Sequence, residues 1–450
     1  MLGSDALILT EGRVRSTAPS TAPCGGRTVA ASRRSPTLAR NRGAHMTSQD
    51  GPLEGLRVVD LTHMLAGPYT TMLLADMGAD VIKVEPLRGD FIRTAGPTFG
   101  EGDERFGGYF HSVNRNKRSI AIDLRSDEGR QVLLDLVRRS DVLVENFRVG
   151  IMERLELGYE TLRQVNPKLV YACIRGFGDP KTGESPYVDW PAYDVIAQAM
   201  GGFMSITGEP DGEPMKAGPG VGDIFAAVLL STGILAAVRQ ADRSGQGQFV
   251  DVGMYDAILS LTERIVYQYS ITGQDPERQG NAHPLFGPFG VFRTSDSWVA
   301  IAAPTDRDWG LLTEAMGRPE LAEDPRFTTT TNRVRNEKDT HAVITEWTHG
   351  LTSAEVAGII GGRIPVGPVQ TISQIIKDPH VATRDMVVEV EHPGTDHKVA
   401  IAGTPIKFDR SEVGVRRRAP LLGEHTADVM GELGYGAEDV ERLRQGDIIA

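Results

Sequence analysis

The chain has 450 residues, of which 40% are hydrophobic and 24% are charged. This composition is typical of a globular protein and excludes a disordered or fibrous chain. The length predicts two or three domains, and no segment contains the roughly 18 uninterrupted apolar residues that span a bilayer, so no membrane association is expected. The two cysteines, Cys24 and Cys173, exclude a disulfide framework and a thiolate metal cluster and indicate a reducing compartment.

The formal net charge of −12 is unevenly distributed. Residues 1–45 carry +5, and the remaining chain from Met46 carries −17, which argues against nucleic acid or an anionic membrane as a partner. Residues 1–45 are rich in Ala, Ser, Thr, Gly and Arg and lack periodicity, so we expect a disordered extension before a natural start at Met46 and a cytoplasmic protein. The same composition also fits an organellar transit peptide, which would indicate an organellar matrix protein.

From Met46 the pattern alternates short apolar strands with helices. Repeated strand–helix–strand units favour a mostly parallel sheet with helices on both faces, and ligands then bind at the carboxyl ends of the strands. The predicted strands are residues 56–61, 80–85, 119–123, 141–146, 169–176 and 248–254, and helices are predicted at 67–77 and 126–139.

Residues 224–238 are apolar on every side, which predicts a helix buried in the core. Five residues, Gly218-Pro219-Gly220-Val221-Gly222, precede it and place Asp223 at or beside the helix N-cap. Beyond this point we expect a helix at 255–270, a linker at 271–285, a strand at 298–303, a helix at 306–316, a polar helical stretch at 320–385 broken at 365–368, strands at 386–390, 400–402 and 406–408, and a helix at 425–433.

Common catalytic motifs are missing from the sequence. It contains no HExxH, Walker or GxSxG motif, the glycine spacing before Asp223 departs from GxGxxG, and the ten histidines are not at metal-ligand spacing. We therefore expect no metal and no tightly bound cofactor. Asp194 and Asp223 each have two interpretations: a helix cap that contributes about 1 kcal/mol, or a nucleophilic carboxylate in a dry site walled by glycine.

Eight short motifs follow one another along the chain: Asp60–Pro68, Gly78–Pro86, Asn116–Ile120, Val144–Phe147, Gly222-Asp223, Gly245–Gln248, Pro365–Pro368 and Ala419–His425. In this order they resemble the class III CoA-transferase family, which contains formyl-CoA transferase and 2-methylacyl-CoA racemases. The resemblance covers about residues 52–440 and leaves residues 1–45 outside.

The resemblance implies a thioester exchange in which an aspartate, by motif position Asp223, attacks an acyl-CoA and forms a mixed anhydride. It also implies an α/β fold, with a large domain of residues 46–255 that contains a Rossmann-like parallel sheet and a smaller inserted α+β domain of residues 280–385. Residues 386–450 are expected to return to the large domain, and two chains are expected to form an interlocked homodimer.

Coenzyme A enters this scheme as part of the substrate, with an acyl-CoA and a carboxylic acid as the reactants. Arg125 and Arg154 suit its phosphates, because a guanidinium binds phosphate in a bidentate manner. Ile122 and Phe147 either flank the adenine or belong to the core. The positions that match the family's CoA contacts are Met64, Leu65, Ile122, Arg125, Asn146, Phe147, Arg154 and Met254.

Two departures from the formyl-CoA transferases indicate other substrates. Residues 280–288 replace a run of four glycines, and Leu65 replaces a glutamine. We expect dicarboxylates with a succinyl-CoA-like donor. A racemase is an alternative, although Ala192-Tyr193-Asp194 stands where racemases have Gly-His-Asp, and a non-catalytic acyl-CoA-binding protein is another.

Overall fold

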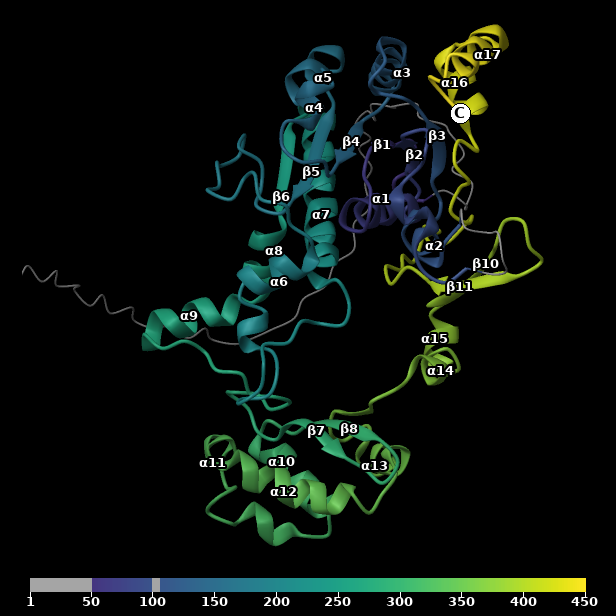
Figure 1. The fold of residues 1–450 in the computed structure, drawn as a ribbon. Coiled ribbons are helices and arrows are strands. Elements are labelled where there is room, and N and C mark those ends of the chain that lie inside the picture. Colours follow the sequence, from purple (N-terminus) through teal and green to yellow (C-terminus); the bar gives the residue numbers. More distant parts are fainter. Residues whose placement is uncertain (1–50, 99–105) are drawn as a thin grey trace, which may run out of the picture. The chain divides into compact units, whose positions relative to one another are not determined.

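Six short apolar strands form a parallel sheet in the order β3-β2-β1-β4-β5-β6 (Figure 1). The computed structural model describes residues 51–98 and 106–450, so the expectations for residues 1–45 lie outside the described residues. The predicted parallel sheet is confirmed, and each strand lies within two residues of its predicted ends. The strands are β1 (Arg57–Asp60), β2 (Asp80–Glu85), β3 (Arg118–Ala121), β4 (Val142–Glu145), β5 (Val170–Arg175) and β6 (Phe249–Gly253).

The strand order reverses direction between β1 and β4. From β1 the chain builds β2 and β3 on one side, and from β4 it builds β5 and β6 on the other. At such a switch point the loops after the two central strands diverge and leave a crevice at their carboxyl ends. The loops that begin at Leu61 and Asn146 therefore border the predicted ligand site.

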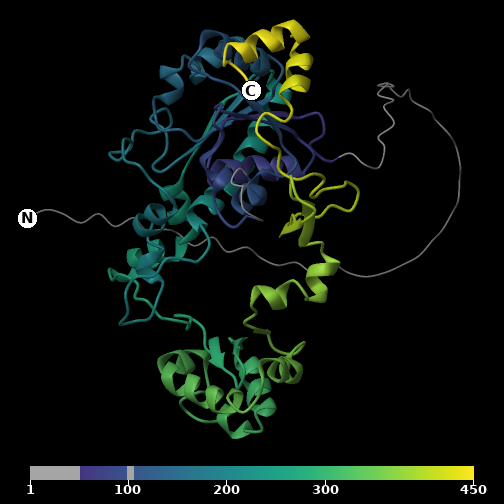
Figure 2. The same cartoon turned by 45° about the vertical axis from the view of Figure 1, so that its right-hand side comes forward.

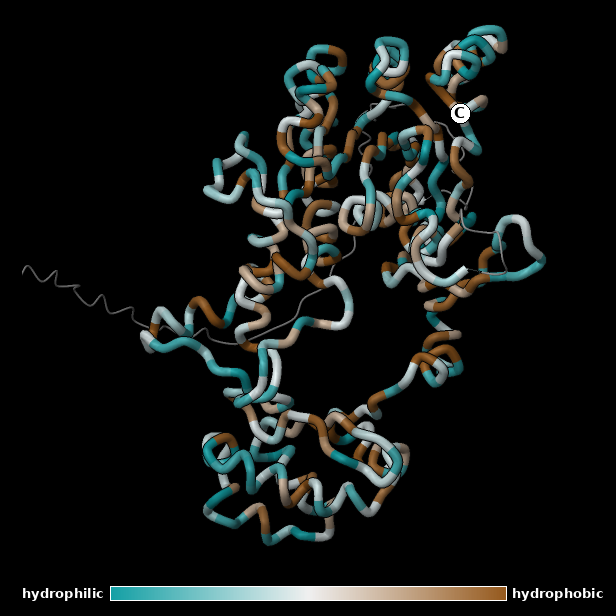
Figure 3. Tube along the Cα trace, viewed as in Figure 1, coloured by the Kyte–Doolittle hydropathy of each residue, from teal (hydrophilic) through white to brown (hydrophobic). Residues whose placement is uncertain are grey.

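Alternate residues of each strand enter two separate cores, one on each face of the sheet. Val59 and Leu143 belong to one core, and Val58 and Val142 belong to the other. Figure 3 shows hydrophobic residues concentrated along these strands. The first core is covered by α3 (Asp127–Arg138), α5 (Tyr159–Val165), α16 (Thr426–Leu433) and α17 (Ala437–Gln445), and the second by α1 (Ala66–Asp76), α6 (Asp194–Met200), α7 (Val221–Ser244) and α8 (Met254–Leu261).

The C-terminal residues pack against the edge of the large sheet. Ile122 forms an antiparallel bridge with Ile449, and the Asp123 amide donates a 2.8 Å hydrogen bond to the Ile448 carbonyl. Figure 2 shows α16 and α17 beside this edge. The chain therefore completes the core of its first domain with its last residues.

A second, antiparallel sheet contains β7 (Phe289–Arg293), β8 (Trp298–Ala302) and β9 (Val366–Pro368). Residues 365–368 interrupt the helical stretch as predicted, and Val366–Pro368 also form a strand that pairs with β8, which was not predicted. The strand β7 was not predicted. Around this sheet lie α10 (Asp306–Ala315), η3 (Pro319–Ala322), α11 (Thr330–Arg335), α12 (Glu337–Thr348) and α13 (Ser353–Ile360).

Two further predictions differ from the structure. Residues 255–270 form two helices, α8 and α9 (Glu263–Thr272), because the chain breaks at Thr262, whose hydroxyl donates to the Gly201 and Ile258 carbonyls. Residues 406–408 form no strand and leave the Phe408 side chain 46% exposed. The remaining elements are η1 (Phe91–Thr94), α2 (Gly108–Asn114), α4 (Ile151–Arg154), η2 (Met204–Ile206), α14 (Ile372–Ile375), α15 (Pro379–Thr383) and the hairpin β10 (Val387–Glu391) and β11 (Lys398–Ala402).

The long helix α7 is buried along one stripe only, which corrects the prediction that it is buried on every side. Val228, on another side of the helix, is 39% exposed. Among the described residues, α7 is the one helix with the length and apolar composition to cross a membrane. Its buried side contacts β5, β6, α1 and α8. The stripe consists of Gly222, Ala226, Leu230, Ile234, Ala237 and Ala241.

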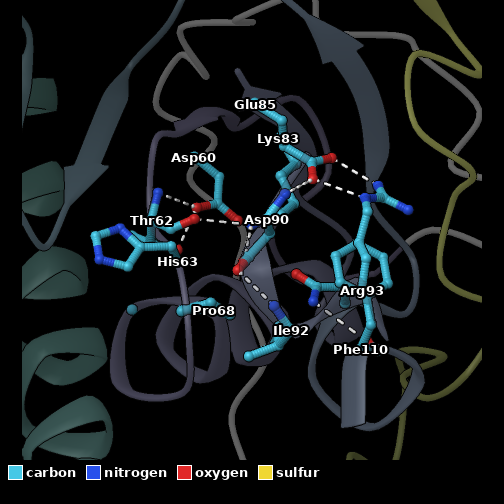
Figure 4. Close-up of polar contacts among 12 residues, drawn as sticks. Asp60, Thr62, His63, Pro68, Lys83, Glu85, Asp90, Ile92, Arg93 and Phe110 are labelled. Carbon is cyan, nitrogen blue, oxygen red and sulfur yellow. Dashed lines mark hydrogen bonds and ion pairs between the residues drawn. The ribbon is translucent and has the colours of Figure 1, made fainter. Parts of the chain in front are cut away.

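A network of buried charges lies below the carboxyl end of β1 (Figure 4). Lys117 Nζ lies 2.9 Å from an Asp60 carboxylate oxygen, and both side chains are fully buried. Burial opposes ionisation of Asp60, but the charges of Lys117 and Lys83 outweigh it and lower the Asp60 pKa to about 2. The carboxylate therefore stays ionised and balances buried ammonium groups.

Replacement of Asp60 tests the importance of this network. Asp60→Asn leaves Lys117 without its carboxylate, and we expect the free energy of unfolding to fall by about 3–5 kcal/mol. Chemical denaturation measures this value. Glu160→Gln is the matched control, because it removes the partner of Lys181 at an exposed ion pair, where the expected loss is below about 1 kcal/mol. Equal losses in the two variants would contradict the expectation.

Candidate active site

The loop after β1 is held through its main chain. Asp60 accepts hydrogen bonds from the Thr62 amide and hydroxyl, and Lys83 Nζ donates to the Thr62 carbonyl at 2.7 Å. The Asn146 side chain, which follows β4, accepts from the His63 amide at 2.9 Å and donates to the His63 carbonyl at 2.8 Å. The two central strands are thus connected across the switch point.

This arrangement fixes the next two residues, Met64 and Leu65. Met64 has φ 66°, a left-handed conformation that few non-glycine residues adopt, and Leu65 caps the start of α1. Both pack against the small core that contains Ile92 and Phe110. Gly67 is required for this path, because a Cβ there would lie 2.3 Å from Thr62 Cβ. The predicted positions Met64 and Leu65 are therefore held in a tightly specified turn.

Phe147 lies on the other side of the same loop. Its ring is 5.5 Å from the His63 ring, and its amide donates to the Glu145 carboxylate at 2.7 Å. Burial raises the Glu145 pKa to about 7, although the charge of Arg175 opposes the rise. Asn146 and Phe147 thus both contact His63, the residue directly before Met64 and Leu65. The four predicted positions therefore lie near one another at the switch point.

The remaining predicted CoA positions lie at the carboxyl ends of other strands and differ in exposure. Ile122 is 1% exposed and Met254 is 6% exposed, so both side chains belong to the cores. Ile122 was expected either to flank the adenine or to belong to the core, and its burial supports the core interpretation. Arg125 is exposed and pairs with Asp123 at 2.8 Å. Arg154 is exposed at the end of α4.

Asp223 is the third residue of α7, whose N-cap is Gly220. Within residues 51–98 and 106–450, no group donates a hydrogen bond to its carboxylate, so Asp223 does not cap its own helix. Asp194 does so instead, because its Oδ1 accepts a 2.7 Å hydrogen bond from the Gly222 amide. The capping interpretation therefore holds for Asp194, but for a helix other than its own.

The surroundings of Asp223 change its acidity. Burial raises its pKa from 3.8 to about 7, and the nearby charge of Asp194 adds to the rise. The pKa of the Tyr109 hydroxyl is also raised, first by burial and then by the charges of Asp223 and Asp194. Tyr109 therefore lies close enough to both carboxylates for their charges to raise its pKa. No motif pointed to it, because it lies in a separate short helix.

A carboxylate in this state suits nucleophilic attack. A raised pKa makes the ionised oxygen more basic, and none of the described residues donates a hydrogen bond to it. The first turn of α7 still favours negative charge that develops there. The arrangement lowers stability: because the folded pKa exceeds the unfolded value, the free energy of unfolding decreases as the pH rises from 3.8 to about 7.

Residues 280–288, which replace the glycine run, belong to a well-anchored segment. Arg333 is fully buried and donates from Nε to the Gly287 carbonyl at 2.7 Å. A cavity of about 610 Å³ adjoins this segment, and its lining includes His283, Phe286 and Trp298. In the described part of the chain, no group of three or more His, Cys, Asp or Glu side chains is arranged to hold a metal ion.

Comparison with known proteins identifies the class of enzyme. The model of CoA-transferase family III matches residues 53–426, and the chain belongs to this family. The predicted family is thereby confirmed, and the protein is an enzyme with CoA-transferase activity.

Several proteins resemble the chain over nearly their whole length. Succinyl-CoA:mesaconate CoA-transferase of Haloarcula hispanica is 51% identical over 387 residues, which are 86% of this chain and 97% of that protein. Succinate–glutarate CoA-transferase of Agrobacterium fabrum is 40% identical over 88% of this chain and 98% of its own. A CAIB/BAIF family protein from Brucella suis has a crystal structure that is 38% identical, with a TM-score of 0.76 over 86% of this chain and 100% of that one.

Asn146 is expected to act on CoA through the loop that it holds. Asn146→Ala removes two hydrogen bonds to His63, each of which contributes about 1 kcal/mol, so we expect CoA affinity to fall about thirtyfold. Calorimetric titration with CoA measures the loss. Asn146→Asp keeps the acceptor for the His63 amide but sets a charged oxygen against the His63 carbonyl, so its affinity should fall at least as far as that of Asn146→Ala. Unchanged CoA affinity in Asn146→Ala would show that the loop is held without it.

Proposed function

We propose that the protein transfers CoA from a succinyl-CoA-like thioester to a dicarboxylic acid, with Asp223 as the covalent nucleophile. The main support for this proposal is the raised pKa of the Asp223 carboxylate, found in a chain that belongs to CoA-transferase family III. The carboxylate lies at the first turn of α7 with a pKa raised to about 7 by burial, and no described residue donates a hydrogen bond to it.

The exchange is built from steps that conserve atoms and charge. The Asp223 carboxylate attacks the thioester carbonyl, the C–S bond breaks, and CoA leaves as a thiolate while a mixed anhydride forms. The thiolate attacks the Asp223 carbonyl, which releases the donor acid and leaves an aspartyl-CoA thioester. The acceptor carboxylate attacks that thioester to give a second anhydride, and the thiolate then takes its acyl group and frees Asp223.

Burial of the site suits such intermediates. Water also hydrolyses an anhydride, so productive transfer requires that water is kept away. The first turn of α7 offers positive potential to the oxyanion of each tetrahedral intermediate. Tyr109 also lies near this site, because the charges of Asp223 and Asp194 raise its pKa.

Dicarboxylates are supported by the relatives and by Leu65. The names of both curated relatives specify dicarboxylic substrates: succinyl-CoA and mesaconate for one, and succinate and glutarate for the other. Leu65 approaches the loop before Asp223, because a Cβ on Gly220 would lie 3.0 Å from Leu65 Cδ2. Its apolar side chain offers no hydrogen bond to a small polar acid such as oxalate.

Coenzyme A would lie along the carboxyl ends of β1, β3 and β4. Arg154 is the better placed of the two predicted phosphate ligands, because none of the described residues forms an ion pair with it. Arg125 would have to exchange Asp123 for phosphate. Salt screens charges beyond about 8 Å at physiological ionic strength. Local arginines can therefore bind the phosphates although the chain has a net charge of −12.

A homodimer is part of the same proposal. Several large apolar side chains on α7, α8 and α9 are exposed in the single chain, more than scattered surface positions require. Sedimentation should give twice the chain mass of 48.8 kDa, and a stable folded monomer would contradict it. The exposed residues are Val228, Leu259, Leu261, Val266, Tyr267, Tyr269 and Ile271.

Replacement of Asp223 separates transfer from the alternatives. A panel of acyl-CoA donors and carboxylic acids, analysed by mass spectrometry, should show exchange with dicarboxylates. Asp223→Ala should lower the rate at least about a thousandfold, because the covalent route is lost. In the wild type, kcat/KM should fall below about pH 7 as Asp223 takes up its proton.

The panel also has outcomes that contradict the proposal. Epimerisation of a 2-methylacyl-CoA without exchange would support the racemase alternative, and CoA binding without turnover would support the non-catalytic one. Exchange at an undiminished rate in Asp223→Ala would remove Asp223 from the mechanism.

A further inference from the structure

Helix α6 presents two polar side chains, one turn apart, toward the segment before Asp223. Gln198 Nε2 donates to Asp194 Oδ2 at 2.7 Å. Gln198 is fully buried and Asp194 is half-buried. An i,i+4 pair of this kind lies on one face of a helix and restrains both side chains.

The same two side chains hold the two ends of the glycine-rich segment Ala217–Gly222. Asp194 Oδ1 accepts from the Gly222 amide at 2.7 Å, and Gln198 Oε1 accepts from the Ala217 amide at 2.8 Å. Both oxygens of the carboxylate and both polar atoms of the amide are therefore occupied. Ala217 and Gly222 cannot move apart unless a hydrogen bond breaks.

The end of the segment lies so close to α6 that Gly222 leaves little room for a side chain. A Cβ on Gly222 would lie 3.1 Å from both Ala197 Cβ and Asp194 Oδ1, which is tighter than most contacts. A Cβ on Gly220 would lie 3.6 Å from Asp194 Cγ, which is an ordinary contact. Asp223 follows directly, so its backbone position is determined by this close packing.

We propose that Asp194 is a positioning residue which, together with Gln198, clamps the segment Ala217–Gly222 and sets both the place and the charge environment of the Asp223 carboxylate. This inference rests on the proposed function of Asp223 as nucleophile. The clamp acts through the Gly222 amide and through charge. It does not contact the acyl group.

The charge of Asp194 gives the clamp a second effect, which a simple cap lacks. The ionisable groups that face Asp223 are Asp194 from α6 and Tyr109 from α2. Tyr109 is neutral at physiological pH, because its pKa is raised above 10.0. A negative Asp194 therefore makes Asp223 harder to ionise and its oxygen more basic. An asparagine in its place keeps the acceptor for the Gly222 amide, and it loses both the charge and the acceptor for Gln198 Nε2.

The pH profile of the transferase separates these roles. In Asp194→Asn, the acidic limb of kcat/KM should move about one unit to lower pH, and kcat above pH 8 should fall about tenfold because Asp223 becomes less basic. Asp242→Asn is the matched control, since it removes one exposed carboxylate at the far end of α7 and should leave the profile unchanged. A limb that stays in place in Asp194→Asn would overturn the inference.

A second variant tests the clamp without a change in charge. Gln198→Ala releases the Ala217 amide, so kcat should fall about tenfold with the KM for acyl-CoA and the acidic limb unchanged. Wild-type kcat in Gln198→Ala would overturn the clamp, even if Asp194→Asn does not fold. If Asp223→Ala is inactive while Asp194→Asn keeps the wild-type profile, the proposed function stands and this inference fails. Activity in Asp223→Ala would instead refute the proposed function.

Discussion

Burial of one carboxylate at the first turn of α7 is the constraint on which the rest of the site depends. A solvated carboxylate would be ionised at neutral pH and would be a weak nucleophile. Withdrawal of Asp223 from water raises its pKa to about 7, and the fold loses stability whenever the group ionises. The stability of the sheet and of its two hydrophobic cores offsets this loss of free energy.

The switch point of the sheet brings the other parts of the site to this carboxylate. Asn146 and Lys83 hold the loop after β1 by its main chain, and that loop places Leu65 against the glycine segment before Asp223. Under the proposed mechanism, coenzyme A, the acyl group and Asp223 would all be positioned by this one rigid part of the fold. The distance between the Asp223 carboxylate and the thioester carbonyl carbon would then depend more on backbone hydrogen bonds than on the flexible side chains that line the site.

The sequence was sufficient for the sheet and the family, because strand alternation and local motifs are short-range signals. It placed Asp223 at or beside the helix N-cap, whereas α7 begins two residues earlier, at Val221, and its N-cap is Gly220. The sequence was insufficient where the outcome depends on distant segments. Ile122 is a core residue because Ile449 returns to the same edge, and Val366–Pro368 form a strand because they pair with β8. The bonds of Asn146 and Asp194 join residues 83 and 28 positions apart, and no local pattern encodes such partners.

Transfer of an isotopic oxygen tests the central claim most directly. If the acceptor acid carries oxygen-18 in its carboxylate, the proposed steps leave one of those oxygens on the Asp223 side chain when product CoA thioester departs. Mass spectrometry of the peptide that contains Asp223 after a single turnover should therefore show one heavy oxygen at that residue. Product formed without label at Asp223 would contradict covalent transfer through this carboxylate.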